Sequence, residues 1–316
     1  MQARKQPLII ANNFHPATIE ALDAAYETTH LWTLDEAEKK AKLAELEGHC
    51  VAAASASWAT DPLLYTLDSL RVIACFGVGV DGIDFTETDR LNIRVTNTPG
   101  VLDDAVADIA LGLIIACSRK FILADAFVRK GQWKKGPLPL GQSLAGMTLG
   151  IAGLGRIGQE IARRAMGFKL NIAYHNRRPK DCDYTYCESL NELASHSDIV
   201  VNVLPGGPAT RKILDASFFD CLGAAGTFIN VGRGQSVDEA ALVQALQNRT
   251  IAAAGLDVYD QEPGVPEALI ALDNVVLLPH IGSATGETRT AMGDLVIGNL
   301  ASFFADQTLV TEFFSS

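Results

Sequence analysis

The sequence predicts an α/β protein with two doubly wound parallel sheets, one in each of two domains. Short, continuously apolar runs alternate with longer helical stretches from about residue 147 onward, and a smaller series of the same kind fills the first hundred residues. Runs that are apolar throughout are typical of parallel strands buried on both faces. The chain is 316 residues long, which corresponds to about two domains of average size.

The first domain is predicted from four apolar runs. They are PLIIANN (7–13), CVAAASA (50–56), RVIACFG (71–77) and IRVTNTPG (93–100). The last run ends in the chain-breaking residues 97–100, which we interpret as a hinge. Residues 101–119 follow as a long helix that is apolar almost all round beyond Ala105. Such a helix must be buried, against another domain or another subunit.

The second domain is predicted from six apolar runs, at residues 148–155, 170–176, 197–205, 226–232, 252–259 and 274–282. Between the first two, Ile157, Ile161, Ala165 and Phe168 are spaced as one face of a helix over residues 156–168. This order of strand, helix and strand predicts a doubly wound sheet. Residues 287–305 are predicted to form an amphipathic helix.

Composition excludes several classes of function. The net charge of −11 argues against a nucleic-acid partner and against an anionic membrane surface. No run reaches the ~18 apolar residues of a membrane span, and the N-terminal apolar run is too short for a signal peptide. The six cysteines include no CxxC pair, so we expect reduced, buried thiols, no metal site and a cytoplasmic location.

A glycine-rich turn follows the first strand of the second domain. The sequence GLGRIG, Gly153 to Gly158, fits the GxGxxG pattern between a strand and a helix, where it predicts dinucleotide binding. Gly153 permits the tight turn, Gly155 lets a pyrophosphate approach the backbone, and Gly158 lets the helix pack on the strand. The alternative is a tight turn without a ligand.

The end of the next strand indicates which dinucleotide is bound. An acidic residue ~20 positions beyond the turn binds the ribose 2′-hydroxyl of NAD. Here Asn176 lies 18 residues after Gly158 and is followed by Arg177 and Arg178. A neutral residue and two guanidinium groups favour a 2′-phosphate. We therefore predict a preference for NADP(H), with NAD(H) as the weaker cofactor; the alternative is that both arginines are merely solvated.

Three later strands end in side chains suited to the reduction of a 2-keto acid. His280 is a candidate proton donor to the carbonyl oxygen, and Glu262 would fix its ring and favour its protonated form. Arg233, between two glycines, would bind the carboxylate and polarise the carbonyl. Each has a structural alternative when taken alone, as a core histidine, a loop charge or a salt-bridge residue. Together, at the carboxyl ends of parallel strands, they predict a catalytic set.

These motifs resemble those of a known family. GLGRIG, NVGRGQSVDEAAL, AGLDVYDQEP and LLPHIGSAT are similar to the D-isomer-specific 2-hydroxyacid dehydrogenases, as are NTPGVLDDAVADIALGL and FGVGVDGID. Within that family the pattern is similar to NADPH-dependent glyoxylate/hydroxypyruvate reductases. The resemblance implies two Rossmann-like domains with the active site in the cleft between them. One is a flavodoxin-like substrate-binding domain of residues 1–99 plus 286–316, and the other is a dinucleotide-binding domain of residues 100–285.

The resemblance also implies roles for individual residues. Arg233, Glu262 and His280 would be catalytic, and the substrate would be bound by Arg233, His280 and the backbone N–H groups of Val78 and Gly79. The residues expected to bind the cofactor are Gly153, Gly155, Arg156, Ile157, Gly158, Asn176, Arg177, Arg178, Pro205, Val231, Gly232, Asp257 and Gly282. A homodimer through the dinucleotide-binding domain is implied, in which Trp133 would approach the partner's active site; the alternative is a packing role for Trp133.

We expect an NADPH-preferring reductase that converts glyoxylate or hydroxypyruvate to D-2-hydroxy acids. Other substrates stay open, because the same scaffold could reduce 2-ketogluconate or an aryl pyruvate. A second alternative is a binding module, since the fold also resembles NAD(H)-sensing transcriptional corepressors. The sequence shows no basic patch and no obvious additional tail, so the enzyme is the favoured interpretation.

Overall fold

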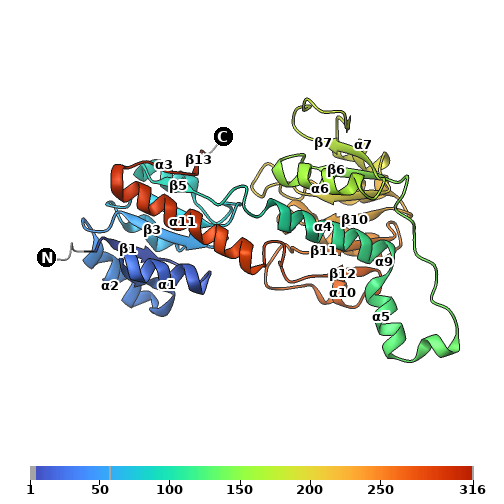
Figure 1. The fold of residues 1–316 in the computed structure, drawn as a ribbon, viewed down its shortest axis with the longest axis horizontal. Coiled ribbons are helices and arrows are strands. Elements are labelled where there is room, and N and C mark those ends of the chain that lie inside the picture. The colour runs from blue at the N-terminus through green and yellow to red at the C-terminus, as the bar shows by residue number, and fades with distance from the viewer. Residues whose placement is uncertain (1–4, 57, 315–316) are drawn as a thin grey trace. The chain divides into compact units, whose positions relative to one another are not determined.

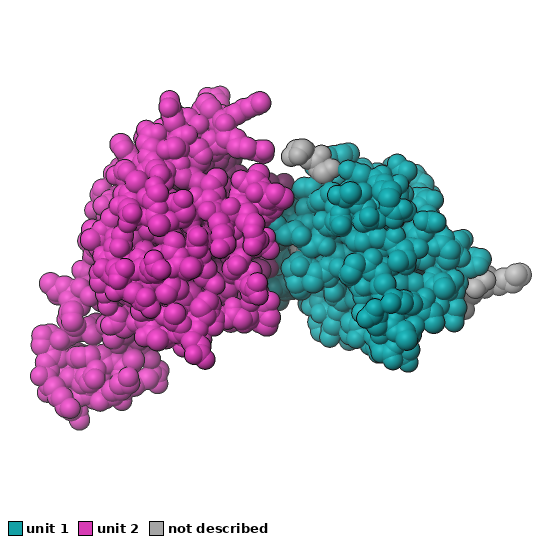
Figure 2. Space-filling model, turned by 180° about the vertical axis from the view of Figure 1, so that it is seen from behind, with its two compact units in different colours: residues 1–102, 285–316 teal, residues 103–284 magenta. Residues whose placement is uncertain are grey.

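The computed structural model describes residues 5–56 and 58–314. The chain divides into two compact units, which are coloured separately in Figure 2. Unit 1 consists of Met1–Leu102 with Thr285–Ser316, and unit 2 consists of Asp103–Ala284. Each unit contains one predominantly parallel sheet with helices on both faces. The predicted fold class, two α/β units with parallel sheets, is confirmed.

Unit 1 contains a six-stranded sheet in the order β13-β5-β4-β3-β1-β2. All neighbouring strands are parallel except β13, which pairs antiparallel with β5. Without β13 this is the flavodoxin-like strand order. The strands are β1 (Pro7–Ile10), β2 (Glu27–His30), β3 (Ala52–Ala56), β4 (Val72–Phe76), β5 (Arg94–Thr96) and β13 (Glu312–Phe313).

Helices cover both faces of this sheet. On one face, α11 (Gly286–Asp306) packs against β4 and against α1 (Pro16–Ala25), as Figure 1 shows. On the other face lie α2 (Glu36–Leu46), α3 (Phe85–Leu91) and the short 3₁₀ segments η1 (Leu31–Thr33) and η2 (Pro62–Thr66). Asp35, Asp84 and Thr285 cap the amino ends of α2, α3 and α11 through side-chain hydrogen bonds, which satisfies backbone donors that a helix leaves unpaired.

Unit 2 contains a parallel seven-stranded sheet in the order β12-β11-β10-β9-β6-β7-β8. Numbered from β6, the strand order is 7-6-5-4-1-2-3, the order of a dinucleotide-binding sheet extended by one strand. The strands are β6 (Thr148–Ala152), β7 (Asn171–His175), β8 (Thr185–Tyr186), β9 (Ile199–Asn202), β10 (Thr227–Asn230), β11 (Ala253–Leu256) and β12 (Val275–Leu277).

Two helical layers enclose the sheet of unit 2. One face carries α7 (Leu190–Ser195), α8 (Ala216–Leu222) and α9 (Glu239–Gln247), whose apolar side chains form a cluster with the strands. The other face carries α4 (Asp103–Ser118) and α6 (Arg156–Met166), which lie side by side in Figure 1. The short segments η4 (Gly234–Ser236) and α10 (Glu267–Ile270) connect the later strands.

The apolar helix predicted after the hinge packs within its own unit. Helix α4 packs on β10, β11 and α6 of its own unit. Val106, Ala110 and Ile114 are among its buried residues. The predicted burial of α4 is thus provided at least on one side by its own unit, because a helix that covers both a sheet and a neighbouring helix is apolar on most of its circumference, and a contact with a second subunit stays a prediction.

An arm that the sequence did not predict extends from unit 2. It comprises α5 (Phe121–Arg129) and the 3₁₀ segment η3 (Gln132–Lys135), followed by an extended segment up to β6. In Figure 1 α5 and this segment project away from the rest of the unit. No residue of α5 or η3 is buried. Although they are apolar, Phe121, Ile122 and Val128 expose more than half of their surface.

Short polar strands were also missed. Strand β2 has the sequence ETTH, and β8 and β13 contain two residues each, so none carries an apolar run. Phe168 lies beyond the end of α6 and is 41% exposed, contrary to its predicted place on the apolar face. Among the described residues, no helix is long and apolar enough to span a membrane.

Candidate active site

The glycine-rich turn connects β6 to α6, and its three glycines lie in different surroundings. Gly153 has φ 101°, a conformation that favours glycine. At Gly158 a Cβ atom would lie 2.4 Å from the carbonyl oxygen of Gly153, so only glycine lets α6 approach the turn this closely. At Gly155, by contrast, a Cβ atom would meet nothing within 4 Å. No described part of the protein fills the space beside Gly155.

The amino end of α6 is suited to an anion. Gly155 is its N-cap residue, and no side chain caps the helix. The first N–H groups of a helix and its dipole favour a phosphate at this position. Arg156, the first residue of α6, forms an ion pair with Asp103 at 3.1 Å, and its side chain stays 63% exposed. The open space at Gly155 and the uncapped helix therefore fit the pyrophosphate of a dinucleotide.

The end of β7 lies beside this turn. Asn176 accepts a hydrogen bond on Oδ1 from the backbone N–H of Leu154, at 2.7 Å. Asn176 thus fixes the glycine-rich turn, which its sequence position alone did not disclose. Arg177 and Arg178 are exposed, and neither forms a hydrogen bond or ion pair with any residue that the structure describes. Both guanidinium groups are available to an anionic ligand.

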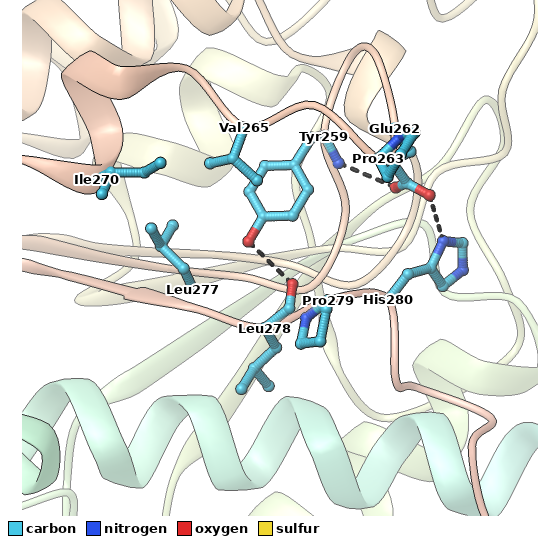
Figure 3. Close-up of a pocket in the computed structure, with 9 residues that line it drawn as sticks. All are labelled: Tyr259, Glu262, Pro263, Val265, Ile270, Leu277, Leu278, Pro279 and His280. Atoms are coloured by element: carbon cyan, nitrogen blue, oxygen red, sulfur yellow. Dashed lines mark hydrogen bonds and ion pairs between the residues drawn. The ribbon is translucent and has the colours of Figure 1, made fainter.

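A histidine and a carboxylate form a close pair farther along the carboxyl edge of the same sheet, after β11 and β12. Nδ1 of His280 lies 2.6 Å from Oε2 of Glu262, as Figure 3 shows. The second carboxylate oxygen, Oε1, accepts a hydrogen bond from the N–H of Tyr259 at 3.0 Å. Because Glu262 engages Nδ1, the other ring nitrogen, Nε2, is the atom left for a substrate.

The charges around Glu262 keep it ionised. Burial works to raise the pKa of this carboxyl, but the hydrogen bond and charge of His280, the N–H of Tyr259 and the nearby Arg233 together hold the pKa below its usual value. An ionised carboxylate beside an imidazole stabilises the protonated ring. The pair can therefore hold a proton next to a substrate oxygen.

The backbone at His280 is held in an unusual conformation. His280 has φ 52°, a left-handed conformation that is uncommon for residues other than glycine. The next two N–H groups, of Ile281 and Gly282, donate to the two carboxylate oxygens of Asp257 at 2.7 and 2.8 Å. The N–H of His280 itself donates to the carbonyl of Asp257 at 2.9 Å. Asp257 thus holds the segment that carries the histidine.

Burial changes the pKa of the Asp257 carboxyl. Its side chain lies within the unit, and burial raises its pKa despite the two backbone hydrogen bonds and the charge of His280, which act in the opposite direction. The sequence placed Asp257 among the cofactor ligands. In the structure both of its oxygens already accept hydrogen bonds from the protein, so cofactor contact stays a prediction.

Arg233 follows β10 and lies between two glycines that packing requires. A Cβ atom at Gly234 would lie 1.8 Å from the backbone of Tyr259, and one at Gly232 would lie 2.9 Å from the carbonyl oxygen of Leu204. The glycines therefore admit neighbouring protein backbone at both positions. Nη1 of Arg233 donates to the carbonyl of Gly232 at 2.8 Å.

A buried polar network supports this turn and was not predicted. The amide of Asn202, at the end of β9, donates to Oδ1 of Asn230 at 2.9 Å and to Oγ of Ser236 at 2.7 Å. Oδ1 of Asn230 also accepts from the N–H of Gly232, and Ser236 donates to the carbonyl of Arg233. All three side chains are buried. The sequence signal for this network was an asparagine at the end of each of two apolar runs, IVVN and TFIN.

An apolar cavity of about 340 Å³ lies behind the His280–Glu262 pair. Tyr259 stands in its wall and donates from its hydroxyl to the carbonyl of Leu278 at 2.9 Å. The complete lining is Tyr259, Glu262, Pro263, Val265, Ile270, Leu277, Leu278, Pro279 and His280, drawn in Figure 3. Apolar walls beside a hydrogen-bonded polar pair lower the local dielectric and strengthen the interaction between its members.

Comparison with known proteins decides the family. The family model described as "D-isomer specific 2-hydroxyacid dehydrogenase, NAD binding domain" matches residues 111–282, more than half of the chain. The chain belongs to this family. The resemblance inferred from the sequence motifs is thereby confirmed.

Three relatives illustrate the similarity. The chain is 44% identical to glyoxylate/hydroxypyruvate reductase A of Arabidopsis thaliana, over 92% of this chain and 93% of the relative. It is 43% identical to the hydroxyphenylpyruvate reductase of Plectranthus scutellarioides, over 92% and 94%. Among solved structures, the NADPH-dependent glyoxylate/hydroxypyruvate reductase of Sinorhizobium meliloti, in complex with NADP and malonate, superposes with a TM-score of 0.91 at 41% identity, over 98% and 97% of the two chains.

The loop predicted to bind the substrate carboxylate in this family member belongs to unit 1. It follows β4, and the side-chain amide of Asn97 donates to the carbonyl of Val78 at 2.7 Å. The N–H groups of Val78 and Gly79 donate to no described residue. Since the C=O and N–H of one trans peptide point in opposite directions, Asn97 directs the N–H of Gly79 away from itself.

The remaining predicted residues lie along unit 2. Ile157 is in the first turn of α6, Pro205 follows β9 and accepts from the hydroxyl of Thr210, and Val231 follows β10 and is buried. Their contacts with a cofactor stay predictions. Trp133 lies in η3 and is 70% exposed, so a packing role within its own unit does not fit the structure.

Proposed function

We propose that the protein is an NADPH-preferring reductase of small 2-keto acids, such as glyoxylate and hydroxypyruvate, that forms D-2-hydroxy acids. The His280–Glu262 pair carries the proposal. A histidine whose Nδ1 is 2.6 Å from a carboxylate is equipped to donate a proton from Nε2, and it stands at the carboxyl end of a sheet whose first turn suits a dinucleotide. The names of the relatives support the same activity.

The roles of the residues follow from this chemistry. A bound nicotinamide would supply a hydride for the carbonyl carbon of the substrate. His280 donates a proton from Nε2 to the carbonyl oxygen, so that the ketone becomes an alcohol. Glu262 stabilises the protonated ring and holds its orientation. Arg233 binds the carboxylate and polarises the carbonyl, and the N–H groups of Val78 and Gly79 bind the same carboxylate.

The two units take different parts in the proposal. We assign dinucleotide binding to residues 100–285 and substrate binding to residues 1–99 with 286–316. Arg177 and Arg178 support the preference for NADP(H), because both are exposed and lack partners within the described chain. The solved relative from Sinorhizobium meliloti, which holds NADP, supports it as well.

Steady-state kinetics with both cofactors test the proposal. We expect kcat/KM to be higher with NADPH than with NADH for glyoxylate and hydroxypyruvate. The double variant Arg177→Ala, Arg178→Ala should raise KM for NADPH by at least about 10- to 150-fold, since the loss of even one charge-assisted hydrogen bond removes ~1.5–3 kcal/mol, and should leave KM for NADH within about threefold. Arg211→Ala, which also removes a charge from unit 2, is the control. A wild-type preference for NADH would refute the cofactor assignment.

An aryl pyruvate is the second candidate substrate. The observation in its favour is the 43% identity to a hydroxyphenylpyruvate reductase over 92% of this chain. Including hydroxyphenylpyruvate and 2-ketogluconate in the same assay ranks all candidates by kcat/KM. A larger kcat/KM for hydroxyphenylpyruvate than for glyoxylate and hydroxypyruvate would replace the substrate assignment while leaving the chemistry intact.

We further propose a homodimer formed through the arm of unit 2. Ile122, Val128, Trp133 and Leu140 expose 55 to 91% of their surface on this arm, and such a group of apolar side chains marks an interaction surface. In the dimer, Trp133 would reach the active site of the partner. Sedimentation of the wild type should give twice the chain mass of 33.7 kDa. The double variant Ile122→Asp, Val128→Asp should give the mass of one chain, whereas the control Lys130→Asp, on the same arm, should keep the mass of the dimer. A monomeric wild type would refute this.

The cysteines support a cytoplasmic location for the enzyme. All six are unpaired, which is typical of proteins in a reducing compartment. The expectation of buried thiols was wrong for Cys182, which is exposed in the loop after β7, and Cys117 and Cys221 are only partly buried. Burial raises the pKa of the Cys75 and Cys117 thiols to about 12, so these two are unreactive at neutral pH.

A further inference from the structure

Among the described residues of unit 1, one guanidinium is half-buried and has no oxygen partner in the described part of the chain. Arg289 of α11 places its guanidinium carbon 5.6 Å from the centre of the Phe76 ring. Its side chain forms no hydrogen bond or ion pair with any described residue. The other described arginines of the unit all have oxygen partners: Arg71 donates to backbone carbonyls, Arg90 to Glu87 and Arg94 to Glu312.

The environment of Arg289 disfavours a charge left on its own. Burial lowers the pKa of this guanidinium, and no carboxylate of the described residues offsets the effect. A cation removed from water costs free energy unless a hydrogen-bonding partner or counter-ion replaces the water. The contact with the Phe76 ring recovers only part of that cost. An oxygen-bearing ligand is the partner that this site lacks.

The position of Arg289 indicates which ligand. Phe76 is the last residue of β4 and is fully buried, and the loop that carries Val78 and Gly79 follows it directly. Phe14 and His15, from the loop after β1, stack on the same ring with centroid distances of 5.0 and 5.8 Å. Arg289 therefore lies at the carboxyl edge of the sheet of unit 1, where ligands of open α/β sheets bind.

The aromatic contacts fix the orientation of the guanidinium. A guanidinium stacked over a ring keeps its N–H groups in a defined plane, from which they can bind a carboxylate or a hydroxyl. His15 adds a second polar side chain to this edge, with Nδ1 at 2.8 Å from Oγ1 of Thr18 and Nε2 not engaged by any described residue. Both groups suit an oxygen atom of a substrate.

We propose that Arg289, with His15 beside it, binds the oxygen-bearing tail of a 2-keto acid and thereby determines substrate preference. The tail is a hydroxyl on C3 or a second carboxylate, whereas the carboxylate common to all 2-keto acids is left to Arg233 and to the N–H groups of Val78 and Gly79. The inference rests on the proposed function. It assigns Arg289 to specificity and gives it no part in hydride or proton transfer.

Substrates that differ only in their tails test this role. Glyoxylate has no tail, hydroxypyruvate has a C3 hydroxyl, oxaloacetate has a second carboxylate, and phenylpyruvate has a tail without oxygen. Arg289→Met should lower kcat/KM about 10- to 100-fold for hydroxypyruvate and oxaloacetate, mainly through KM, because a hydrogen bond to a charged group is lost. The values for glyoxylate and phenylpyruvate should change by less than about threefold.

Two further variants complete the experiment. Arg289→Lys keeps the charge and should retain part of the preference for oxaloacetate, while Arg90→Met removes an arginine from α3 and should leave the ratios between substrates unchanged. Equal losses for all four substrates in Arg289→Met, or no loss for any, would overturn the proposal, and a thermal melt shows whether a uniform loss reflects unfolding. A wild-type protein that reduces none of the four would instead contradict the proposed function.

Discussion

The substitution Glu262→Gln tests the proton donor directly, because it changes one atom of the pair. The carboxylate offers two oxygens to two donors: Oε2 lies 2.6 Å from Nδ1 of His280, and Oε1 accepts the N–H of Tyr259 at 3.0 Å. Glutamine has one oxygen and one NH₂ group. If the oxygen keeps Tyr259, the NH₂ group faces Nδ1, and the protonated imidazole loses its acceptor.

The magnitude follows from the bond that is lost. A hydrogen bond between charged groups contributes about 1.5–3 kcal/mol, and losing it from the protonated ring should lower kcat by roughly 10- to 150-fold. KM for NADPH should change by less than about twofold, because Glu262 is not among the residues assigned to the cofactor.

Single-turnover reduction of glyoxylate by NADPH, followed by the absorbance of the nicotinamide, measures the chemical step. Glu239→Gln is the matched control, since its carboxylate accepts the N–H of Asp260 at 3.3 Å and does not touch His280. The control should retain kcat within about twofold. A kcat for Glu262→Gln equal to that of the wild type would refute the assignment of the pair.

Two other predictions follow from the same site. Gly155→Ala should leave the melting temperature unchanged, because its Cβ meets nothing within 4 Å, but it should weaken NADPH binding. Gly158→Ala should instead destabilise the fold by ~1–3 kcal/mol, because its Cβ would lie 2.4 Å from a carbonyl oxygen. Equal NADPH affinity for Gly155→Ala and wild type would argue against the pyrophosphate site. Because the pKa of Glu262 lies below its usual 4.5 in the folded state, its contribution to stability is present above pH 4.5 and is lost as the pH falls through the folded pKa. The melting temperatures of wild type and Glu262→Gln should therefore differ at neutral pH and converge in acid, and a constant difference would contradict this sign.

Much of the fold was predictable because its signals are local. The apolar runs that became β6, β7, β9, β10, β11 and β12 are continuous in the sequence and need no knowledge of their partners. The strand ETTH, β2, was missed because its pairing with β1 holds it in place and its own side chains give no apolar pattern. The apolar surface of α4 was visible in the sequence, but its partners, β10, β11 and α6, were not.

The candidate site likewise has features that the sequence predicts and features that it does not. The residue types and their order along the chain indicate Arg233, Glu262 and His280 as candidates, because the proposed chemistry requires a cation, a carboxylate and a proton donor at strand ends. The structure brings Glu262 and His280 together, and the catalytic roles stay predictions. The clamp of Asp257 on the N–H groups of Ile281 and Gly282 involves residues 24 and 25 positions apart, and no local pattern reports it.

The sequence by itself determined the strands, the glycine-rich turn and the types of side chain that end the strands, since each is a property of a short segment. The tertiary structure alone decided which atoms meet. It placed Nδ1 of His280 on Glu262, bound Asn176 to the turn through Leu154, and left Arg289 over Phe76 without an oxygen partner among the described residues. Hydrogen bonds and desolvation depend on distances of a few ångströms between segments far apart in the chain, and only the folded arrangement sets those distances.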